Sequence, residues 1–167
     1  MGSEMCIRDS SKVQQATDFL TDVISVFGDQ PKQNAAATDE LLDSISKREL
    51  LDDHSGSYVH HYPICFRRVL SDPTLISMTA DADEDWYAIS FISYQRPDER
   101  EGFYAFADFI SSAVAELFGG RCHWGKYNPL TREQNHELYP QLGRFLKIAN
   151  RFDPHGQFLN DWLDEVT

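Results

Sequence analysis

The segment Trp86-Tyr87-Ala88-Ile89-Ser90-Phe91-Ile92-Ser93-Tyr94 is the clearest strand pattern in the chain. Successive side chains of a strand point to opposite faces of its sheet, so positions 88, 90, 92 and 94 share one face and positions 87, 89, 91 and 93 share the other. Most of these residues are aromatic or β-branched, as strands favour. The pattern predicts a strand at 86–94, and the neighbouring segments are read outward from it.

Two further segments are predicted to pair with this strand. Residues 62–70 also alternate, with Ile64, Phe66 and Arg68 on one face and Cys65, Arg67 and Val69 on the other. Pro63 places the beginning of that strand at an edge or entry point, because proline has no N–H for the ladder. Residues 75–79 are expected to pair briefly, and 121–124 form a short extended segment after two glycines.

Helical periodicity surrounds these strands. Apolar residues recur at helical spacing over 11–27, more briefly after residue 38, and over about five turns beginning at Pro97. Thr131 resembles the first residue of a capping box, Pro140 is expected to reset the helix that follows, and Phe158 and Leu159 are expected to pack back after a turn at 153–156. The order of elements predicts an α+β fold, with helices on one face of an antiparallel sheet.

Composition limits the classes of function. The 167 residues carry a net charge of −12 and are 41% hydrophobic. This suits one globular domain with a real core. Nucleic acid is a poor partner for so acidic a chain, and no apolar run reaches the ~20 residues of a membrane span. No signal peptide is recognisable, so a cytoplasmic location is expected.

The cysteines and histidines do not show the spacing of a metal site. Three cysteines are present, with no C-x-x-C pair among them and no H-x-x-x-H pair among the histidines. No metal is therefore expected. Zinc bound by Cys65, Cys122, His60, His61 and His123, as in a small metal-dependent hydrolase, is the alternative.

The first ten residues are interpreted separately. Residues 1–10 show no periodicity and no helix cap, and 5–10 resemble a leader that is not native to the protein. They are excluded from the predicted fold. Residues 11–167 are taken as one domain, interpreted as a fragment of a longer protein.

The segment Cys122-His123-Trp124-Gly125-Lys126-Tyr127-Asn128-Pro129 holds the candidate chemistry. On an extended chain Lys126 would fall on the face of Trp124, away from His123. A turn at Gly125 would bring His123 and Lys126 to one pocket. Otherwise Trp124 is a core residue and Lys126 a surface charge.

Two ordered motifs resemble a known family. His123-Trp-Gly-Lys126, followed about thirty residues later by Asp153-Pro-x-Gly-x-Phe-x-Asn160, is similar to the carboxy-terminal end of the aldonolactone oxidases. These vanillyl-alcohol-oxidase-type flavoenzymes include D-arabinono-1,4-lactone oxidase, L-gulonolactone oxidase and alditol oxidase. The family also has a Glu-x-Arg strand, where this chain has Cys65 and Arg67. The resemblance covers roughly 58–167.

The resemblance implies a substrate-binding cap domain of an FAD enzyme that oxidises a sugar lactone or polyol by hydride transfer. Lys126 would lie at the substrate oxygens or the flavin, His123 would support it, and Arg67 would polarise the hydroxyl or stabilise the reduced flavin. The resemblance also places five residues near substrate or cofactor: Cys65, Trp124, Gly125, Asn128 and Asn160.

Two departures from the family qualify this interpretation. Cys65 removes a carboxylate that could orient a hydroxyl. No Gly-rich phosphate-binding segment is present either, so FAD would be held mainly by an N-terminal domain of the same protein, and the chain alone is expected to be inactive. The alternative function is a non-catalytic α+β binding or interaction domain.

Overall fold

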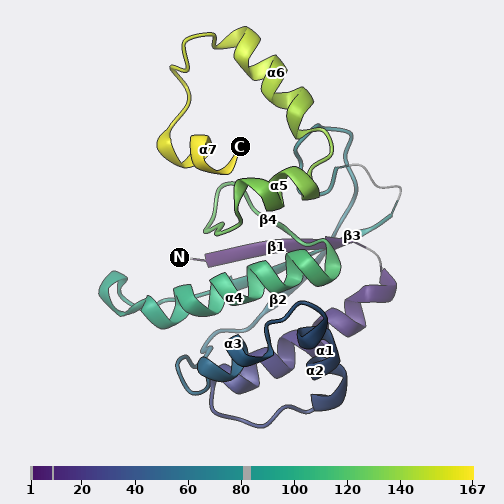
Figure 1. The fold of residues 1–167 in the computed structure, drawn as a ribbon, viewed down its shortest axis with the longest axis vertical. Coiled ribbons are helices and arrows are strands. Elements are labelled where there is room, and N and C mark those ends of the chain that lie inside the picture. Colours follow the sequence, from purple (N-terminus) through teal and green to yellow (C-terminus); the bar gives the residue numbers. More distant parts are fainter. Residues whose placement is uncertain (1, 9, 81–83) are drawn as a thin grey trace.

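The computed structural model describes residues 2–8, 10–80 and 84–167. Within them lies a four-stranded antiparallel sheet in the order β2-β3-β1-β4 (Figure 1). The strands are β1 (Gly2–Arg8), β2 (Cys65–Val69), β3 (Trp86–Ile92) and β4 (Arg121–Cys122). The predicted strands around 62–70, 86–94 and 121–124 are thus confirmed, each shorter than its pattern. The segment 75–79 is not a strand, and the neighbouring Asp72 and Ala80 form only an isolated bridge.

The interior strand β1 was not predicted. It pairs with β3 from Gly2 to Arg8 and with β4 at Met5 and Cys6. Excluding residues 1–10 from the fold is therefore wrong for residues 2–8 and 10, and residues 1 and 9 lie outside the described part. That this segment is a leader not native to the protein stays a prediction. Without β1, neither β3 nor β4 would have a partner on the side that β1 occupies, and their backbone groups there would lack hydrogen bonds.

Helices α1 (Ser10–Phe27) and α4 (Glu101–Phe118) cover one face of the sheet, as predicted (Figure 1). A short 3-10 turn, Pro97–Glu99, leads into α4 at the predicted proline. The second predicted helix is α2 (Ala35–Ser44), which begins three residues earlier than expected. A further helix, α3 (Arg48–Asp53), was not predicted, and its one buried residue, Leu51, anchors it to the core.

The main core lies between this helical layer and the sheet. Each element contributes fully buried apolar side chains to it: Met5 and Ile7 from β1, Ile89 and Phe91 from β3, Phe19, Val23 and Phe27 from α1, and Phe103, Phe106 and Ile110 from α4. Burying large apolar side chains is the main source of stability of such a domain. The apolar stripe predicted around Phe106 is confirmed as core packing.

Three shorter helices lie beyond the β4 edge, on the side away from α1–α3 (Figure 1). They are α5 (Arg132–Leu138), α6 (Leu142–Phe152) and α7 (Asp161–Val166). Thr131 and Gln134 form the predicted capping box, and Pro140 separates α5 from α6 as expected. The prediction that Phe158 and Leu159 pack back is wrong, since both are exposed.

Candidate functional site

The strand register gives the sheet a second face, opposite α1 and α4. Glu4 of β1 lies opposite Ser90 of β3, and Ser90 lies opposite Cys65 of β2. These three residues therefore form one row across the sheet, on the face that the apolar residues Met5 and Ile89 do not use. We call this the open face. It carries these polar groups beside a small buried apolar cluster of Cys6, Trp86 and Ala88, whereas the other face carries the main core.

The carboxylate of Glu4 is the centre of a charged cluster on the open face. Its Oε2 lies 2.5 Å from Arg67 Nη2 and 2.8 Å from Lys126 Nζ. Ser90 Oγ donates to the same oxygen, and Arg67 Nη2 also lies 2.9 Å from Ser90 Oγ. Two cations from elements far apart in sequence thus converge on one carboxylate.

Burial and charge act in opposite directions on Glu4, which is only 7% exposed. Burial alone would raise the pKa of its carboxyl group. The hydrogen bonds from Lys126 and Ser90, with the charges of Lys126 and Arg67, outweigh burial and bring this pKa below its usual value. The group is therefore a carboxylate at neutral pH. The side chains of Arg67 and Lys126 are 60% and 37% exposed, so both remain accessible to a ligand.

A turn at 123–126 aims Lys126 at this carboxylate. The backbone N–H of His123 donates to Glu4 O at 2.9 Å, which extends the pairing of β1 and β4. The chain then turns, and the N–H of Lys126 donates back to His123 O at 3.0 Å. The turn predicted at Gly125 is confirmed. A side chain there would meet the ring of His123 at 3.3 Å, so glycine suits the position.

His123 and Lys126 point to different partners. The imidazole Nδ1 of His123 accepts the N–H of Gly125 at 2.9 Å, whereas Lys126 Nζ reaches Glu4. His123 thus shapes the turn that carries Lys126. The supporting role in catalysis predicted for His123 stays a prediction.

Trp124 links the turn to the α5–α7 side of the molecule. Its indole N–H donates to Ile76 O at 2.8 Å, and its ring packs against Tyr139 at 5.0 Å and Trp162 at 6.3 Å between centroids. Trp124 therefore connects the turn that carries Lys126 to the later helices. Its predicted position close to a ligand stays a prediction.

A buried arginine, Arg121 of β4, lies at the β4 end of the sheet. The guanidinium of Arg121 stacks between the rings of Trp86 and Tyr139, 4.8 and 4.7 Å from their centroids, and donates to Ala80 O at 2.9 Å. Cys6 lies opposite Arg121 in the register. Burial, and then the charge of Glu4, raise the pKa of the Cys6 thiol to about 12, so this cysteine is no nucleophile at neutral pH.

The remaining predicted residues have structural contacts of their own. Asn128 is buried, and its Oδ1 accepts the N–H of Leu130 at 3.1 Å. Asn160 caps α7 by accepting the N–H of Leu163 at 2.8 Å. Cys65 is exposed at one end of the row that contains Glu4. Their predicted positions near substrate or cofactor stay predictions.

Glu4 is the site residue that sequence reasoning missed. It lies in the segment set aside as a leader, although 3–7 read Ser-Glu-Met-Cys-Ile. Met5 and Ile7 alternate there with Glu4 and Cys6, which is the pattern of a strand with one apolar face. These five residues are a short pattern, but they are the part of the sequence that could have predicted β1.

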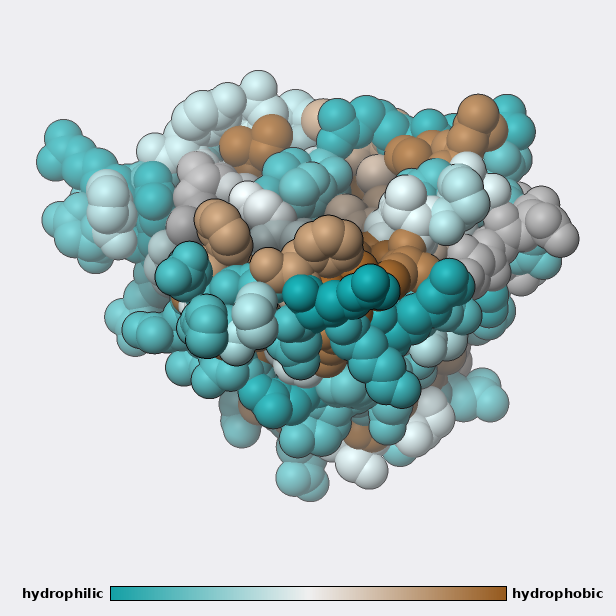
Figure 2. All heavy atoms as spheres, turned by 90° about the horizontal axis from the view of Figure 1, so that it is seen from above, coloured by the Kyte–Doolittle hydropathy of each residue, from teal (hydrophilic) through white to brown (hydrophobic). Residues whose placement is uncertain are grey.

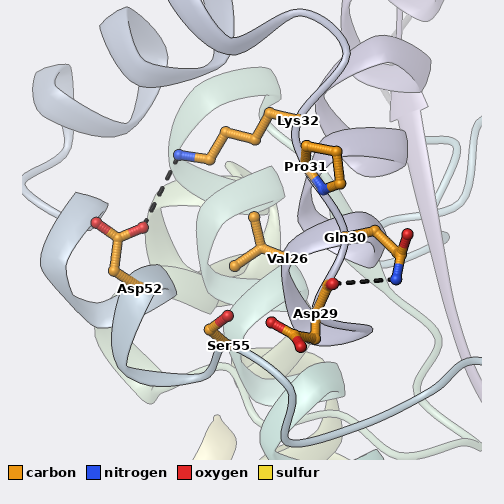
Figure 3. Close-up of a pocket in the computed structure, with 7 residues that line it drawn as sticks. All are labelled: Val26, Asp29, Gln30, Pro31, Lys32, Asp52 and Ser55. Carbon is orange, nitrogen blue, oxygen red and sulfur yellow. Dashed lines mark hydrogen bonds and ion pairs between the residues drawn. The ribbon is translucent and has the colours of Figure 1, made fainter.

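Other candidate positions lie apart from the charged cluster. A polar hollow of about 420 Å³ lies between the end of α1 and α3, and its lysine, Lys32, is paired with Asp52 (Figure 3). Lys32 is also paired with Asp39. His60 stacks on Phe106 of the core at 5.6 Å. In 2–8, 10–80 and 84–167, no group of three or more His, Cys, Asp or Glu side chains is placed to hold a metal ion. None of the helices described is long and apolar enough to cross a membrane.

The fold and the cluster define an α+β domain in which two partly exposed cations, Arg67 and Lys126, pair with a buried carboxylate. The family model for D-arabinono-1,4-lactone oxidase matches residues 30–166, so the chain belongs to that family. The resemblance in the sequence is thereby confirmed. Glu4 lies before the matched range, whereas Arg67 and Lys126 lie within it.

Three relatives illustrate the similarity. A long-chain alcohol oxidase of an uncultured marine euryarchaeote is 42% identical over 151 residues, which cover 90% of this chain and 32% of the relative. An L-gulonolactone oxidase of Scyliorhinus torazame is 30% identical over 136 residues, 81% of this chain and 28% of the relative. An L-gulono-1,4-lactone dehydrogenase of Mycobacterium tuberculosis is 27% identical over 143 residues, with the same shares. The chain thus spans about a third of the length of these relatives or less.

Proposed function

We propose that this chain is the carboxy-terminal, substrate-binding and catalytic part of an FAD-dependent oxidoreductase that oxidises a hydroxyl of a sugar-1,4-lactone or alditol. Membership of the D-arabinono-1,4-lactone oxidase family supports the oxidoreductase class. The observation that carries the proposal is the convergence of Lys126 and Arg67 on Glu4. A domain that binds FAD, outside these residues, would complete the enzyme.

The donor set suits the flavin end of FAD. When bound, FAD accepts a hydride from the carbon that bears the hydroxyl. Fixed cations beside such a reaction stabilise the negative charge that develops in the transition state. Lys126 and Arg67 supply two such cations on the open face, and Glu4 holds both in place. The pyrophosphate of FAD would be bound by the other domain.

The three charged residues can each form a different hydrogen bond with the substrate. Lys126 has three N–H donors, and its contact with Glu4 uses one, so it can also donate to a substrate oxygen. Arg67, more exposed, can donate to a second oxygen of a lactone or polyol. The ionised Glu4 can accept a hydrogen bond from the hydroxyl to be oxidised, which orients that hydroxyl.

Glu4 also offers a replacement for the carboxylate that the family carries at the position of Cys65. Both residues lie in the same row, separated by Ser90, and Arg67 reaches from the strand of Cys65 to the oxygen of Glu4. The open face therefore has one carboxylate beside its arginine, on a different strand from the expected one. This arrangement supports keeping the polyhydroxy substrate in the proposal.

The test uses a fusion in which this chain replaces the matched 151 residues of the euryarchaeote relative. The fusion, loaded with FAD, is mixed without oxygen with L-gulono-1,4-lactone, D-arabinono-1,4-lactone, an alditol or a long-chain primary alcohol, and loss of the visible flavin absorption is timed. We expect bleaching by a lactone or alditol. Lys126→Met should slow it by about 10²–10³-fold, the usual cost of removing one preorganised donor.

Lys47→Met is the matched control, because Lys47 pairs with Glu116 at 3.1 Å on the helical side of the sheet. It should bleach at the wild-type rate. A fusion that holds FAD but is bleached by neither lactone and by no alditol contradicts the proposed function, even where the long-chain alcohol bleaches it. Wild-type bleaching by the Lys126→Met fusion contradicts the role of Lys126.

A further inference from the structure

An exposed apolar surface lies at the α6–α7 end of the molecule, beside Trp124. It surrounds a cavity of about 480 Å³ whose lining is almost entirely apolar: Ile76, Trp124, Phe145, Phe152, Phe158 and Leu159 contribute to it. Seen from this end, hydrophobic atoms gather in the middle of the face and hydrophilic ones surround them (Figure 2). We call this surface the α6–α7 face. An exposed apolar patch with a polar rim is typical of an interaction site.

Helix α6 has an apolar stripe that this chain does not cover. It packs chiefly against α5, whereas α1 and α4 bury their stripes against the sheet. Leu142 at its beginning is fully buried, but Phe152 at its end is 82% exposed. Most of the stability of an amphipathic helix comes from packing of its apolar face. The far end of α6 therefore lacks the contact that its sequence is suited to make.

The loop after α6 holds a second phenylalanine in solvent with a defined backbone. Both carboxylate oxygens of Asp153 accept backbone N–H groups, from Gln157 and Phe158, each at 2.8 Å. Gly156 adopts the left-handed conformation, φ 64°, that allows this tight turn. Phe158 is 84% exposed. An aromatic side chain on a preorganised loop loses little entropy on binding, so it suits the centre of an interface.

Length and charge together indicate what covers this face. About two thirds of the euryarchaeote relative lies outside its match to this chain, so the relative has a large further part that could pack here. A second copy of this chain is disfavoured, because two chains that each carry a net charge of −12 would repel each other. Trp124 lines the cavity and belongs to the same turn as Lys126. A part docked on the α6–α7 face is therefore held next to the charged cluster.

From these observations we infer that the α6–α7 face is the docking surface for the flavin-binding part of the enzyme, with Phe152 and Phe158 as its anchors. The inference rests on the proposed function in one respect only, that the part docked here binds FAD. Docking here joins the two parts through Trp124, so the same contact that buries the phenylalanines positions the partner at Lys126. The face is an interaction surface, separate from the residues that contact substrate.

The test uses two separate polypeptides: this chain, and the euryarchaeote relative without its matched residues, purified with FAD. Their dissociation constant is measured by sedimentation velocity, following flavin absorbance, with no substrate present. We expect a complex, and we expect Phe152→Ser and Phe158→Ser each to weaken it by about 30-fold or more, as for hot-spot residues. Val59→Ser is the matched control, since Val59 is 68% exposed between α3 and β2, and it should bind as the wild type does.

A second measurement tests the inference if the flavin-binding part does not fold as a separate polypeptide. In the fusion protein described above, wild type and Val59→Ser should unfold in one thermal transition, and Phe158→Ser in two. Wild-type behaviour of both phenylalanine variants, in either measurement, overturns the inference and leaves the proposed function intact. A wild-type chain that binds dodecanol in this cavity but not the flavin-binding part also overturns it. A complex that forms as expected but is bleached by no substrate contradicts the proposed function alone.

Discussion

The two faces of the sheet are built from the same strands but do different work. On one face Met5, Ile89 and Phe91 pack against α1 and α4 and are fully or almost fully buried. On the other, one residue away along each strand, Glu4 and Ser90 meet Arg67 and Lys126. Because successive side chains of a strand point to opposite faces, one strand can contribute alternate residues to the core and to the charged cluster.

The largest expected effect lies on the apolar face. Phe106 is fully buried. The centroid of its ring lies 5.3 Å from that of Phe27 and 5.5 Å from that of Phe91. Phe106→Ala should lower the free energy of unfolding by about 3–5 kcal/mol, because it removes a buried ring and leaves a cavity. Urea denaturation measures the loss. Phe66→Ala is the control, because Phe66 lies on the apolar face of edge strand β2 but is 41% exposed, and it should cost clearly less. Equal losses would contradict the contrast between core and edge.

A smaller effect is expected on the open face. Glu4→Gln removes the charge that holds Arg67 and Lys126, but both cations are partly exposed and can turn to water. The free energy of unfolding should fall by about 1–2 kcal/mol, in the range of a charged hydrogen bond. The exposed Glu137→Gln should change it by less than about 0.5 kcal/mol in the same denaturation experiment. A loss as large as that of Phe106→Ala would mean that the open face also carries the fold.

The smallest effect is a dependence on pH. Because the pKa of Glu4 is lower in the folded chain than in the unfolded one, its ionised form favours the folded state. That contribution is complete above the unfolded value of about 4.3 and is lost as the pH falls through the lower folded pKa. The stability difference between wild type and Glu4→Gln should therefore be constant from pH 7 to 5 and shrink below about pH 4. Denaturation curves across this range measure it, and a difference that persists at pH 3 would contradict the assignment.

Local patterns sufficed for most of the fold. The alternation at 86–94, the apolar spacing around Phe106 and the capping box at Thr131 each contain their own physical cause within a few residues. Helix α3 is only six residues long, too short for periodicity to show. Phe158 and Leu159 were expected to be buried because they are apolar, yet their surroundings depend on contacts that no local pattern contains.

The candidate site was predictable only in part. Lys126 and the turn at Gly125 follow from a short motif, and the alternation of 62–70 places Arg67 and Cys65 on one face. That Glu4 meets both cations could not be read locally, because the contact depends on strand order. Register brings together three segments that are distant in the chain, and the sequence shows no sign of that order.

The interior position of β1 also determines when the sheet can form. Glu4 precedes Ser90 by 86 residues and Lys126 by 122, yet it contacts both. A newly synthesised β1 must therefore wait until β3 and then β4 have left the ribosome. Closing such long loops makes folding slow, on the scale of milliseconds to seconds. A translation product that stopped before β4 would leave one edge of β1 unpaired and open to aggregation.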